Sequence, residues 1–583
     1  MNSTSVSAVF RLLLAAFWLS ACTPPETLSA PGAPASPQAP AAVPGTGARV
    51  AGVAAANPLA VDAGLEVLAA GGNAADAAVA IQAMLGLVEP QSSGVGGGAF
   101  MLYYDAASKK LTAFDGRETA PAGATAEMFI DEKGEPLSYR DAVLSGRSTG
   151  VPGAIAMLGA VHARQGTLPW QKLFEPAIRA AESGFEVPKR MARFVNGESA
   201  QSGQPDVRAI FSRADGSKIQ AGDSFRNPAY AAALHSIGSQ GPRALLEPPL
   251  RDRIIARAQA EPRPGSLAAA DFDAWQPRIT ESLCGPYLVY LVCVPPPPSS
   301  GVSLLQMLAI LDRTDIARRG PEDPQAWFLF AMASRLMYAD RDQYVADPEF
   351  VLVPVQGMIE PHYISRRAAL IGDVPGPAPA AGEPVSIERG ADATREAAGT
   401  SHFVVIDRDG NIVSMTTTVE SLFGSGRAVD GFMLNNQLTD FSFRPAIDGK
   451  PVANAVAGGK RPRSSMAPVI VLDASGRPIA ALGSPGGSSI LAYNAKAIVG
   501  LLAWKLPLQE AINLPNVVAR GDEYYGEAAK LAPGVLEALA ARGVVVKSGR
   551  GEESGLHGLV INADGIVTGA ADPRREGVWK TLP

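Results

Sequence analysis

Two alternating strands around one tight turn, placed deep inside the chain, constrain the fold more than any other feature of this sequence. The stretch GTSHFVVIDRDGNIVSMTTTVESLFGSG runs from Gly399 to Gly426 in a chain of 583 residues. Asp409-Gly410-Asn411 suits the turn, because Gly and Asn tolerate positive φ. The hairpin therefore places Thr400, at the start of one strand, beside Thr418, at the end of its partner.

The segment before this hairpin differs from it. Residues 372–399 are rich in Pro, Ala, Gly and charge and have little apolar periodicity, which predicts a linker or mobile tail. A Thr that starts a strand after such a tail suggests an N-terminal nucleophile, whose own α-amine is the general base. That chemistry needs a cut between Gly399 and Thr400, which the same hydroxyl can make by an N→O acyl shift. Taken alone, a Gly-Thr pair indicates only the entry to a strand.

The N-terminus predicts export. The apolar run LLLAAFWLSA is too short to span a bilayer and has the length of the apolar part of a secretory signal. It ends in LSAC, which resembles a bacterial lipobox, so we expect removal of residues 1–21 and a lipid on Cys22. The alternative is an ordinary signal peptide with an incidental cysteine. Thr23 in place of Asp favours a periplasmic protein that is anchored to the outer membrane. The Pro/Ala-rich residues 22–47 predict a tether between the anchor and the body of the protein.

Charge and cysteine content narrow the function. Lys and Arg number 51 against 57 Asp and Glu, and there is no long basic run, so nothing indicates a nucleic-acid partner. Export permits a disulfide between Cys284 and Cys293, but two unpaired cysteines are equally open. The five His residues form no HExxH or similar pattern, so we predict no metal and no cofactor.

Periodicity along the rest of the chain indicates mixed α and β structure. The 583 residues, with 47% hydrophobic content, are sufficient for one large core or for two domains. The expected elements are two helices in 52–88 split by Gly71-Gly72-Asn73, a hairpin turning near 108–109, a largely helical 152–193, a helix at 325–340, strands at 467–473 and 479–482, and a helix at 489–504.

Two short motifs point elsewhere and are rejected on context. GVGGGA at 94–99, followed by Asp115, imitates a dinucleotide fingerprint, but the strand FMLYYD follows it where that fingerprint needs a helix. GRSTG at 146–150 fits the nucleophile elbow of serine hydrolases, but no later His has a distinctive context. Close backbone packing and a turn before a helix are the simpler explanations.

The chain resembles the γ-glutamyltranspeptidase family from about residue 48 to the C-terminus. The motifs that carry the resemblance, in order, are ANPLAVDAGLEVLAAGGNAADAAVA, EPQSSGVGGGAFMLYYD, DGRETAP, PPPPSSGVSLLQML, YADRDQYVADPEF, GTSHFVVIDRDGNIVSMTTT, LNNQLTDFSF, KRPRSSMAP and GSPGGSS. The resemblance implies the αββα sandwich of the N-terminal nucleophile (Ntn) hydrolases. It also implies one precursor that cuts itself into a large subunit, 48–399, and a small subunit, 400–583, which remain together as a heterodimer.

The resemblance also implies roles at the reaction centre. Thr400 would be the nucleophile of self-cleavage and catalysis, and Thr418 would orient it by a hydrogen bond. Gly486 and Gly487 would donate backbone N–H groups to the oxyanion, which suits a Gly-Gly turn that allows close approach.

Further roles concern substrate binding. Arg117 would hold the α-carboxylate of the substrate, because its planar fork suits a carboxylate. Ser464 and Ser465 would add donors to that carboxylate, and Gln437 and Asp440 would take the α-ammonium. Taken singly, each of these residues is as well explained by a solvated or structural polar side chain.

Two departures from the family pattern concern the acyl pocket. Glu420 stands where the family commonly has Asn, and it either accepts from an ammonium or reshapes the pocket for another acyl group. The stretch FRPAIDGKPVANAVAGG, between Asp440 and Lys460, has no Tyr and no distinct aromatic lid. Because cephalosporin-acylase-like members are lid-poor, a wider pocket is expected.

Together these features predict an exported, lipid-anchored γ-glutamyl hydrolase or transferase that acts on glutathione and similar amides. The acyl group would pass from Thr400 to water or to an amino acid or peptide acceptor. The alternatives are a related acylase for another acyl group, such as a glutaryl-type β-lactam side chain, and an inactive surface lipoprotein that binds a ligand.

Overall fold

The computed structural model describes residues 50–549 and 554–582, apart from residues 393, 395 and 398. The predicted signal peptide, the lipidation site at Cys22 and the tether lie outside the described residues. In the part of the chain that is described, no helix is both long and apolar enough to cross a membrane.

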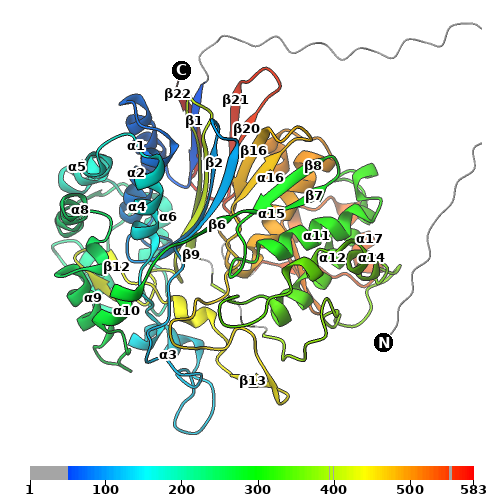
Figure 1. Ribbon diagram of the computed structural model, residues 1–583, viewed down its shortest axis with the longest axis horizontal. Coiled ribbons are helices and arrows are strands. Elements are labelled where there is room, and N and C mark those ends of the chain that lie inside the picture. The colour runs from blue at the N-terminus through cyan, green and yellow to red at the C-terminus, as the bar shows by residue number, and fades with distance from the viewer. Residues whose placement is uncertain (1–49, 393, 395, 398, 550–553, 583) are drawn as a thin grey trace, which may run out of the picture. The chain divides into compact units, whose positions relative to one another are not determined.

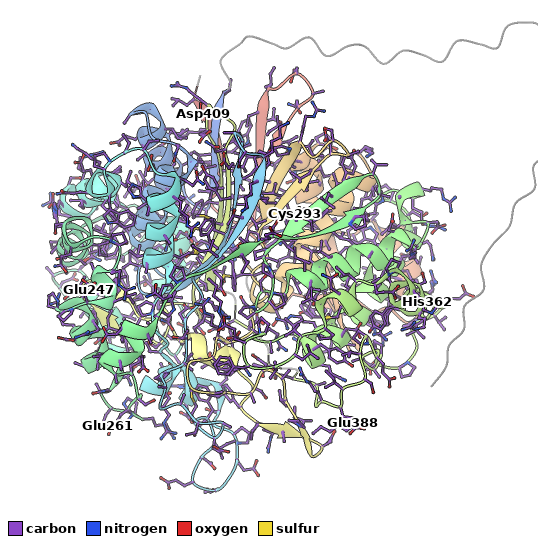
Figure 2. All side chains as sticks on the ribbon, viewed as in Figure 1. Glu247, Glu261, Cys293, His362, Glu388 and Asp409 are labelled. Carbon is purple, nitrogen blue, oxygen red and sulfur yellow. A yellow bond between two sulfur atoms is a disulfide. The ribbon has the colours of Figure 1, made fainter. Side chains whose placement is uncertain are left out.

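A seven-stranded antiparallel sheet contains the hairpin of the nucleophile candidate at its centre. Its strand order is β22-β1-β9-β10-β2-β3-β6. The strands are β1 Ala51–Ala55, β2 Gly98–Asp105, β3 Lys110–Asp115, β6 Arg278–Glu281, β9 Gly399–Ile406, β10 Ile412–Glu420 and β22 Val578–Leu582. Asp409, labelled in Figure 2, lies in the turn between β9 and β10, as predicted.

A second antiparallel sheet of six strands has the order β21-β20-β16-β15-β8-β7. Its strands are β7 Leu283–Tyr287, β8 Tyr290–Val294, β15 Val469–Leu472, β16 Pro478–Gly483, β20 His557–Ile561 and β21 Val567–Ala571. Cys284 and Cys293 face each other across β7 and β8 and form a disulfide. This resolves the alternative that the sequence left open.

The two sheets pack face to face. Val404 and Ile412 of the first sheet and Ile470 and Leu559 of the second share one buried apolar cluster. Side chains alternate along a strand, so Thr400 points to the same face of β9 as Val404. The Thr400 side chain therefore belongs to the inner face of the first sheet, at the end of the apolar interface.

Helices cover the outer face of each sheet, as Figure 1 shows. The first sheet is packed against α1 Pro58–Ala69, α2 Ala74–Val88, α4 Ala154–Gln165, α5 Glu175–Ser183 and α8 Pro228–Gln240. The second is packed against α11 Gly301–Asp312, α12 Pro324–Tyr344 and α15 Ile490–Ile498. The four layers form the predicted αββα sandwich.

The remaining elements are shorter and lie around these layers. The helices are α3 Tyr139–Leu144, α6 Lys189–Val195, α7 Pro205–Ile210, α9 Leu250–Ala258, α10 Ala269–Ala274, α13 Val355–Met358, α14 Pro361–Ala368, α16 Leu508–Asn513 and α17 Pro533–Ala541. The strands are β4 Phe185–Glu186, β5 Ser224–Phe225, β11 Ala428–Val429, β12 Phe432–Met433, β13 Ala446–Ile447, β14 Lys450–Pro451, β17 Val517–Arg520, β18 Glu523–Gly526 and β19 Lys547–Ser548.

The predicted helix pair at 52–88 is correct except at its start. Residues 51–55 form β1, which is buried along its whole length, because a short run of small apolar residues has no period that separates strand from helix. The second helix begins where the sequence suggested: Asn73 caps α2, and its backbone N–H donates to Asp76 in a capping box. The split at Gly71-Gly72-Asn73 is confirmed.

Both rejected motifs are structural. The glycines at 94–99 lead through a turn into β2 and not into a helix. Ser148 lies in a short 3₁₀ turn before α4, where its buried hydroxyl donates to the carbonyls of Val143 and Ser145. A hydroxyl committed in this way is no nucleophile.

Candidate active site

The side chains of Thr400 and Thr418 meet across the central strands. The two residues are direct partners in the antiparallel register, and a bulge follows between Thr418 and Glu420. The Thr400 hydroxyl donates to Thr418 Oγ1 at 3.2 Å, and Thr418 Oγ1 donates to the Gly399 carbonyl oxygen at 2.6 Å. The Glu420 N–H also donates to Thr418 Oγ1, at 2.8 Å. One hydroxyl has one proton and two acceptor sites, so Thr418 is fully engaged.

This arrangement suits attack on the Gly399 carbonyl. The Thr418 hydroxyl polarises the carbonyl oxygen, and its lone pair faces the proton of the Thr400 hydroxyl. Arg575 Nη1 donates to the Thr400 carbonyl oxygen at 3.0 Å and holds the other side of the residue. Gly399 is required for packing as well, since a Cβ there would lie 2.4 Å from the Glu420 carbonyl oxygen.

A small cavity beside Thr400 brings most of the predicted site residues together. Its free volume is about 10 Å³, and Glu396 and Ala397, from the segment before the predicted cut, form part of its wall. The lining residues are Arg117, Glu396, Ala397, Thr400, Thr418, Glu420, Gln437, Asp440, Ser464, Met466, Gly487 and Ile490. Among the site residues predicted at or near the reaction centre, three do not line this cavity: Gly399, Ser465 and Gly486.

The glycine turn at Gly486 and Gly487 lies directly beneath the segment before the predicted cut. Gly486 and Gly487 have φ of 137° and 54°, and the turn opens the helix α15. A Cβ on Gly487 would lie 2.3 Å from the Glu396 carbonyl oxygen. Only glycine permits both this backbone and this approach. Ser488 fixes the segment above, because its Oγ accepts from the Glu396 N–H at 2.7 Å.

Arg117 and Asp440 contact each other. Arg117 is fully buried, and its Nη2 lies 2.5 Å from Asp440 Oδ2 and donates to the Arg463 carbonyl oxygen at 2.7 Å. Gln437 Nε2 also donates to Asp440, at 2.6 Å. Burial, reinforced by the Glu420 carboxylate, raises the pKa of Asp440 well above its ordinary value, while Arg117 opposes that shift. Arg117, predicted to bind the substrate's α-carboxylate, and Asp440, predicted to bind its α-ammonium, are therefore in direct contact.

The Glu420 carboxylate has a dense set of donors. It accepts from the Ala397 N–H at 2.8 Å, from the Ser421 hydroxyl at 2.6 Å, and from Asn436. The Tyr139 hydroxyl, from α3, lies 3.2 Å from the same carboxylate and 2.8 Å from Ser421 Oγ. Tyr139 was not predicted from the sequence, since nothing near it in the chain indicates contact with residues some 280 positions later.

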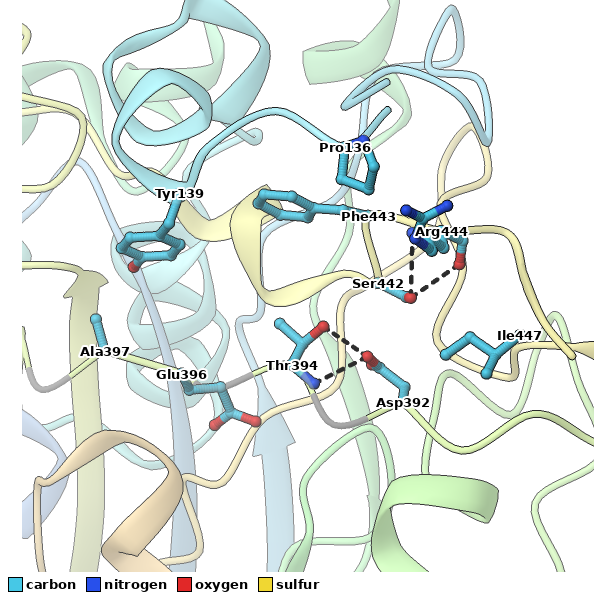
Figure 3. A pocket seen from close by; sticks show the side chains of 10 residues that line it. All are labelled: Pro136, Tyr139, Asp392, Thr394, Glu396, Ala397, Ser442, Phe443, Arg444 and Ile447. Atoms are coloured by element: carbon cyan, nitrogen blue, oxygen red, sulfur yellow. Dashed lines mark hydrogen bonds between the residues drawn. The ribbon is translucent and has the colours of Figure 1, made fainter. Parts of the chain in front are cut away.

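A larger cavity adjoins the small one, and Figure 3 shows the side chains that line it. It measures about 630 Å³ and shares the walls formed by Glu396 and Ala397. Tyr139 and Phe443 form its apolar side, and Phe443 stacks on Phe129 with ring centroids 4.6 Å apart. The stretch after Asp440 contributes Ser442, Phe443, Arg444 and Ile447 to this cavity, and the expectation of a wider acyl pocket stays a prediction.

Two buried arginines were also missed. Arg341 and Arg463 hold Glu396 and Asp392, which belong to the segment expected to be a mobile tail. The signal was available, because Arg341 lies in YADRDQYVADPEF and Arg463 in KRPRSSMAP, two of the motifs quoted above. Among the described residues, no group of three His, Cys, Asp or Glu side chains is placed to hold a metal ion.

Comparisons with known proteins agree with this geometry. The model of the family described as Gamma-glutamyltranspeptidase matches residues 60–582. A glutathione hydrolase proenzyme of Bacillus subtilis is 35% identical over 538 residues, which cover 90% of each chain. An acylase ACY 1 proenzyme of Pseudomonas sp. (strain V22) is 36% identical over 548 residues, 92% of this chain and 94% of the relative.

A solved structure supports the fold. The cephalosporin acylase from Bacillus halodurans superposes with a TM-score of 0.78 over 94% of this chain and 99% of its own, at 24% identity. The match of the family model over nearly all described residues, together with these relatives, establishes that the chain belongs to the gamma-glutamyltranspeptidase family of Ntn hydrolases.

Proposed function

We propose that this protein is a self-processing γ-glutamyl hydrolase or transferase with Thr400 as its nucleophile. The single observation that carries the proposal is the hydrogen-bonded series from the Thr400 hydroxyl through Thr418 Oγ1 to the Gly399 carbonyl oxygen. The relatives are named proenzymes, which supports a self-cut precursor.

Self-cleavage follows from that geometry. Thr400 Oγ1 attacks the Gly399 carbonyl carbon, a C–O bond forms, and the C–N bond between Gly399 and Thr400 breaks as the amine takes a proton. Water then hydrolyses the ester. The products are a free carboxylate on Gly399 and a free α-amine on Thr400, which serves as general base in turnover.

The same hydroxyl then acts on the substrate amide. Thr400 Oγ1 forms an ester with the acyl group while the amine leaves, and Gly486 and Gly487 donate N–H groups to the oxyanion. Water or an amino acid or peptide acceptor releases the acyl group. Arg117, Ser464 and Ser465 are proposed for the α-carboxylate, with Gln437, Asp440 and Glu420 for the α-ammonium.

Strand pairing supports a stable heterodimer after the cut. In the first sheet, β9 of the C-terminal piece pairs with β1 of the N-terminal piece, and β10 pairs with β2. In the second sheet, β15 pairs with β8 in the same way. Each product strand therefore keeps its partner, and the two pieces stay together.

A related acylase remains a second candidate, because a relative named as an acylase is 36% identical. Export and lipid attachment at Cys22 complete the proposal, with the lipid as the membrane contact.

The test uses purified protein and two chromogenic amides, γ-glutamyl and glutaryl p-nitroanilide. We expect two polypeptides, the smaller beginning at Thr400, with higher kcat/KM on the γ-glutamyl compound. Active protein that remains one intact chain would overturn the Thr400 mechanism. Preference for the glutaryl amide would assign the acylase function.

A further inference from the structure

A separate cavity, distinct from the candidate active site, has a wall that consists almost entirely of cationic side chains. It measures about 220 Å³ and shares no lining residue with the cavity beside Thr400 or with the larger cavity that adjoins it. Its lining residues are Lys189, Arg190, Arg193, Arg574, Arg575 and Glu576. Pockets for drug-sized ligands measure about 300–1,000 Å³, so a volume of this size suits a small ion.

Two distant parts of the chain form this wall. Lys189, Arg190 and Arg193 belong to α6, where the two arginines are three residues apart and therefore lie on the same side of the helix. Residues 574–576 lie between β21 and β22. The Arg190 N–H donates to Glu576 Oε1 at 3.1 Å and joins the two parts. Under the proposed cut at Thr400, the first part belongs to the large subunit and the second to the small one.

The two buried arginines of the wall are held in place by other contacts. Arg190 Nη1 contacts Glu89 and donates to Ser92 Oγ at 3.0 Å. Arg575 Nη1 donates to the Thr400 carbonyl oxygen at 3.0 Å. Arg190 is 4% exposed and Arg575 is 7% exposed. Because these guanidinium groups are already ordered, an anion that binds beside them loses little affinity to side-chain entropy.

The wall carries more positive than negative charge. It has five cationic side chains and one carboxylate, that of Glu576. Three further carboxylates pair with Arg190 or Arg574 and do not line the cavity; they are Glu89, Glu527 and Asp572. Even when these three are counted with Glu576, the cations of the wall remain in excess. Guanidinium groups match the geometry of oxyanions, so the cavity favours an oxyanion.

Glu576 adds a selectivity that a purely cationic wall would lack. Its Oε1 accepts from the Arg190 N–H, whereas its Oε2 is buried and has no hydrogen-bond partner among the described residues. A carboxylate oxygen repels an anion without a proton, but it accepts a hydrogen bond from an anion that carries one. Hydrogen phosphate carries such a proton at neutral pH, and sulfate carries none.

We propose that this cavity binds hydrogen phosphate. Glu576 Oε2 accepts the proton of the ion, and the cationic groups around its oxygens are those of Lys189, Arg190, Arg193 and Arg575. The bound ion connects α6 to the stretch before β22, and it bridges the two subunits once the chain is cut. The cavity is present in the uncut chain, so the site does not depend on the proposed self-cleavage.

A binding test uses the uncut variant Thr400→Ala and the wild type. Isothermal titration calorimetry at pH 7.5, with NaCl holding the ionic strength constant, measures the Kd of phosphate and of sulfate. We expect phosphate to bind both proteins saturably, and sulfate to bind at least about 10-fold more weakly, because it cannot donate to Glu576. Absence of saturable phosphate binding would overturn the site.

A pair of double variants locates the binding. Lys189→Gln with Arg193→Gln removes two cations from the wall, and we expect the Kd of phosphate to rise by about 10-fold or more. The matched control is Lys172→Gln with Arg243→Gln, which removes the same charges from exposed ion pairs outside the cavity and should leave the Kd unchanged. An equal Kd in the two double variants would overturn the site.

Glu576→Gln tests the selectivity. The amide oxygen still accepts from the Arg190 N–H, while the amide nitrogen donates to sulfate, so we expect the preference for phosphate over sulfate to be lost. A variant that keeps the preference of the wild type would overturn the role of Glu576. Glycerol 3-phosphate, which is mostly without a proton at pH 7.5, is the third ligand; binding as tight as that of phosphate would replace hydrogen phosphate by a phosphate monoester.

The two proposals fail separately. A cut and active enzyme that does not bind phosphate would overturn this site and leave the Thr400 mechanism standing. A wild-type chain that is active without being cut would overturn that mechanism, whereas the phosphate titration of Thr400→Ala would still decide the anion site.

Discussion

The Thr418 hydroxyl donates a 2.6 Å hydrogen bond to the Gly399 carbonyl oxygen, the group that Thr400 is proposed to attack. The same oxygen of Thr418 accepts from Thr400, so one side chain contacts both the nucleophile and the electrophile. The contact exists because the hairpin register pairs residues 400 and 418, and because the bulge after Thr418 turns the Glu420 N–H toward its hydroxyl.

Thr418→Val removes this donor at nearly constant shape. We expect self-cleavage to slow by about 100- to 1000-fold, as for the loss of one oxyanion donor. Thr418→Ser retains the hydroxyl and is expected to cleave at a rate close to wild type. A time course of chain cleavage on denaturing gels, with N-terminal sequencing of the smaller product, measures both. Equal rates for wild type and Thr418→Val would contradict the role of this hydroxyl.

Arg117→Ala tests the binding of the substrate's α-carboxylate. Loss of a charged hydrogen-bonded partner costs about 2–5 kcal/mol, or roughly 30- to several-thousand-fold in kcat/KM. The Tm should also fall, because Asp440 loses the guanidinium that contacts it. Self-cleavage at Thr400 is expected to continue, and Arg117→Lys should recover part of the activity. A cleaved Arg117→Ala enzyme with near-normal kcat/KM on glutathione would refute the assignment.

Glu420→Gln tests whether the negative charge selects an ammonium. A hydrogen bond to a charged group contributes about 1.5–3 kcal/mol, so the preference for γ-glutamyl over glutaryl p-nitroanilide should fall by roughly 10- to 100-fold. Tyr139→Phe is the control, since it removes a hydroxyl contact with Glu420 and keeps the charge. The measurement is the ratio of the two kcat/KM values. A ratio that does not change in Glu420→Gln would show that Glu420 does not read the ammonium.

Glu118 makes stability depend on pH. Its side chain is fully buried, both oxygens lack a hydrogen-bond partner among the described residues, and burial raises its pKa to about 8. Because folding raises the pKa of this acid, the folded state favours the protonated form. The stability from Glu118 is therefore complete below the unfolded pKa of about 4.5 and is lost as pH rises through about 8.

Glu118→Gln stays neutral and removes this dependence. We expect its Tm relative to wild type to increase steadily from pH 5 to pH 8.5, because only the wild type must ionise a buried carboxyl group. Thermal unfolding of both proteins across this range measures the difference. Parallel Tm profiles would mean that folding does not raise the pKa of Glu118.

Cys22→Ala tests the proposed anchor. The variant should move from the membrane fraction to the soluble fraction and keep its activity, because Cys22 precedes the described sandwich, whose first strand is β1 Ala51–Ala55. Several acyl chains on one cysteine hold a protein firmly, whereas one chain alone binds only marginally. Fractionation with an activity assay measures both properties. A variant that stays with the membrane would exclude the lipobox.

Local features of the sequence were sufficient for the hairpin and its nucleophile. The Asp409–Asn411 turn sets the register of β9 and β10, and the register places Thr400 opposite Thr418 without help from the rest of the molecule. The cap of α2 at Asn73 is local in the same sense. The short strand β1 was missed, because its five small apolar residues have no period, and its pairing with β9 and β22 decides its conformation.

By itself, the sequence determined the family, because its motifs are runs of neighbouring residues, and the resemblance to that family implied the layered architecture and the residue types of the site. Only the tertiary structure decided which charges neutralise one another. Arg117 contacts Asp440, which lies 323 residues later in the chain, and Arg341 and Arg463 contact acids of the segment before the proposed cut. The physical reason is that a buried charge is stable only beside an opposite charge, and the packing of the two sheets and their helices decides which residues lie beside it. Separation along the chain does not reveal which residues are close in space.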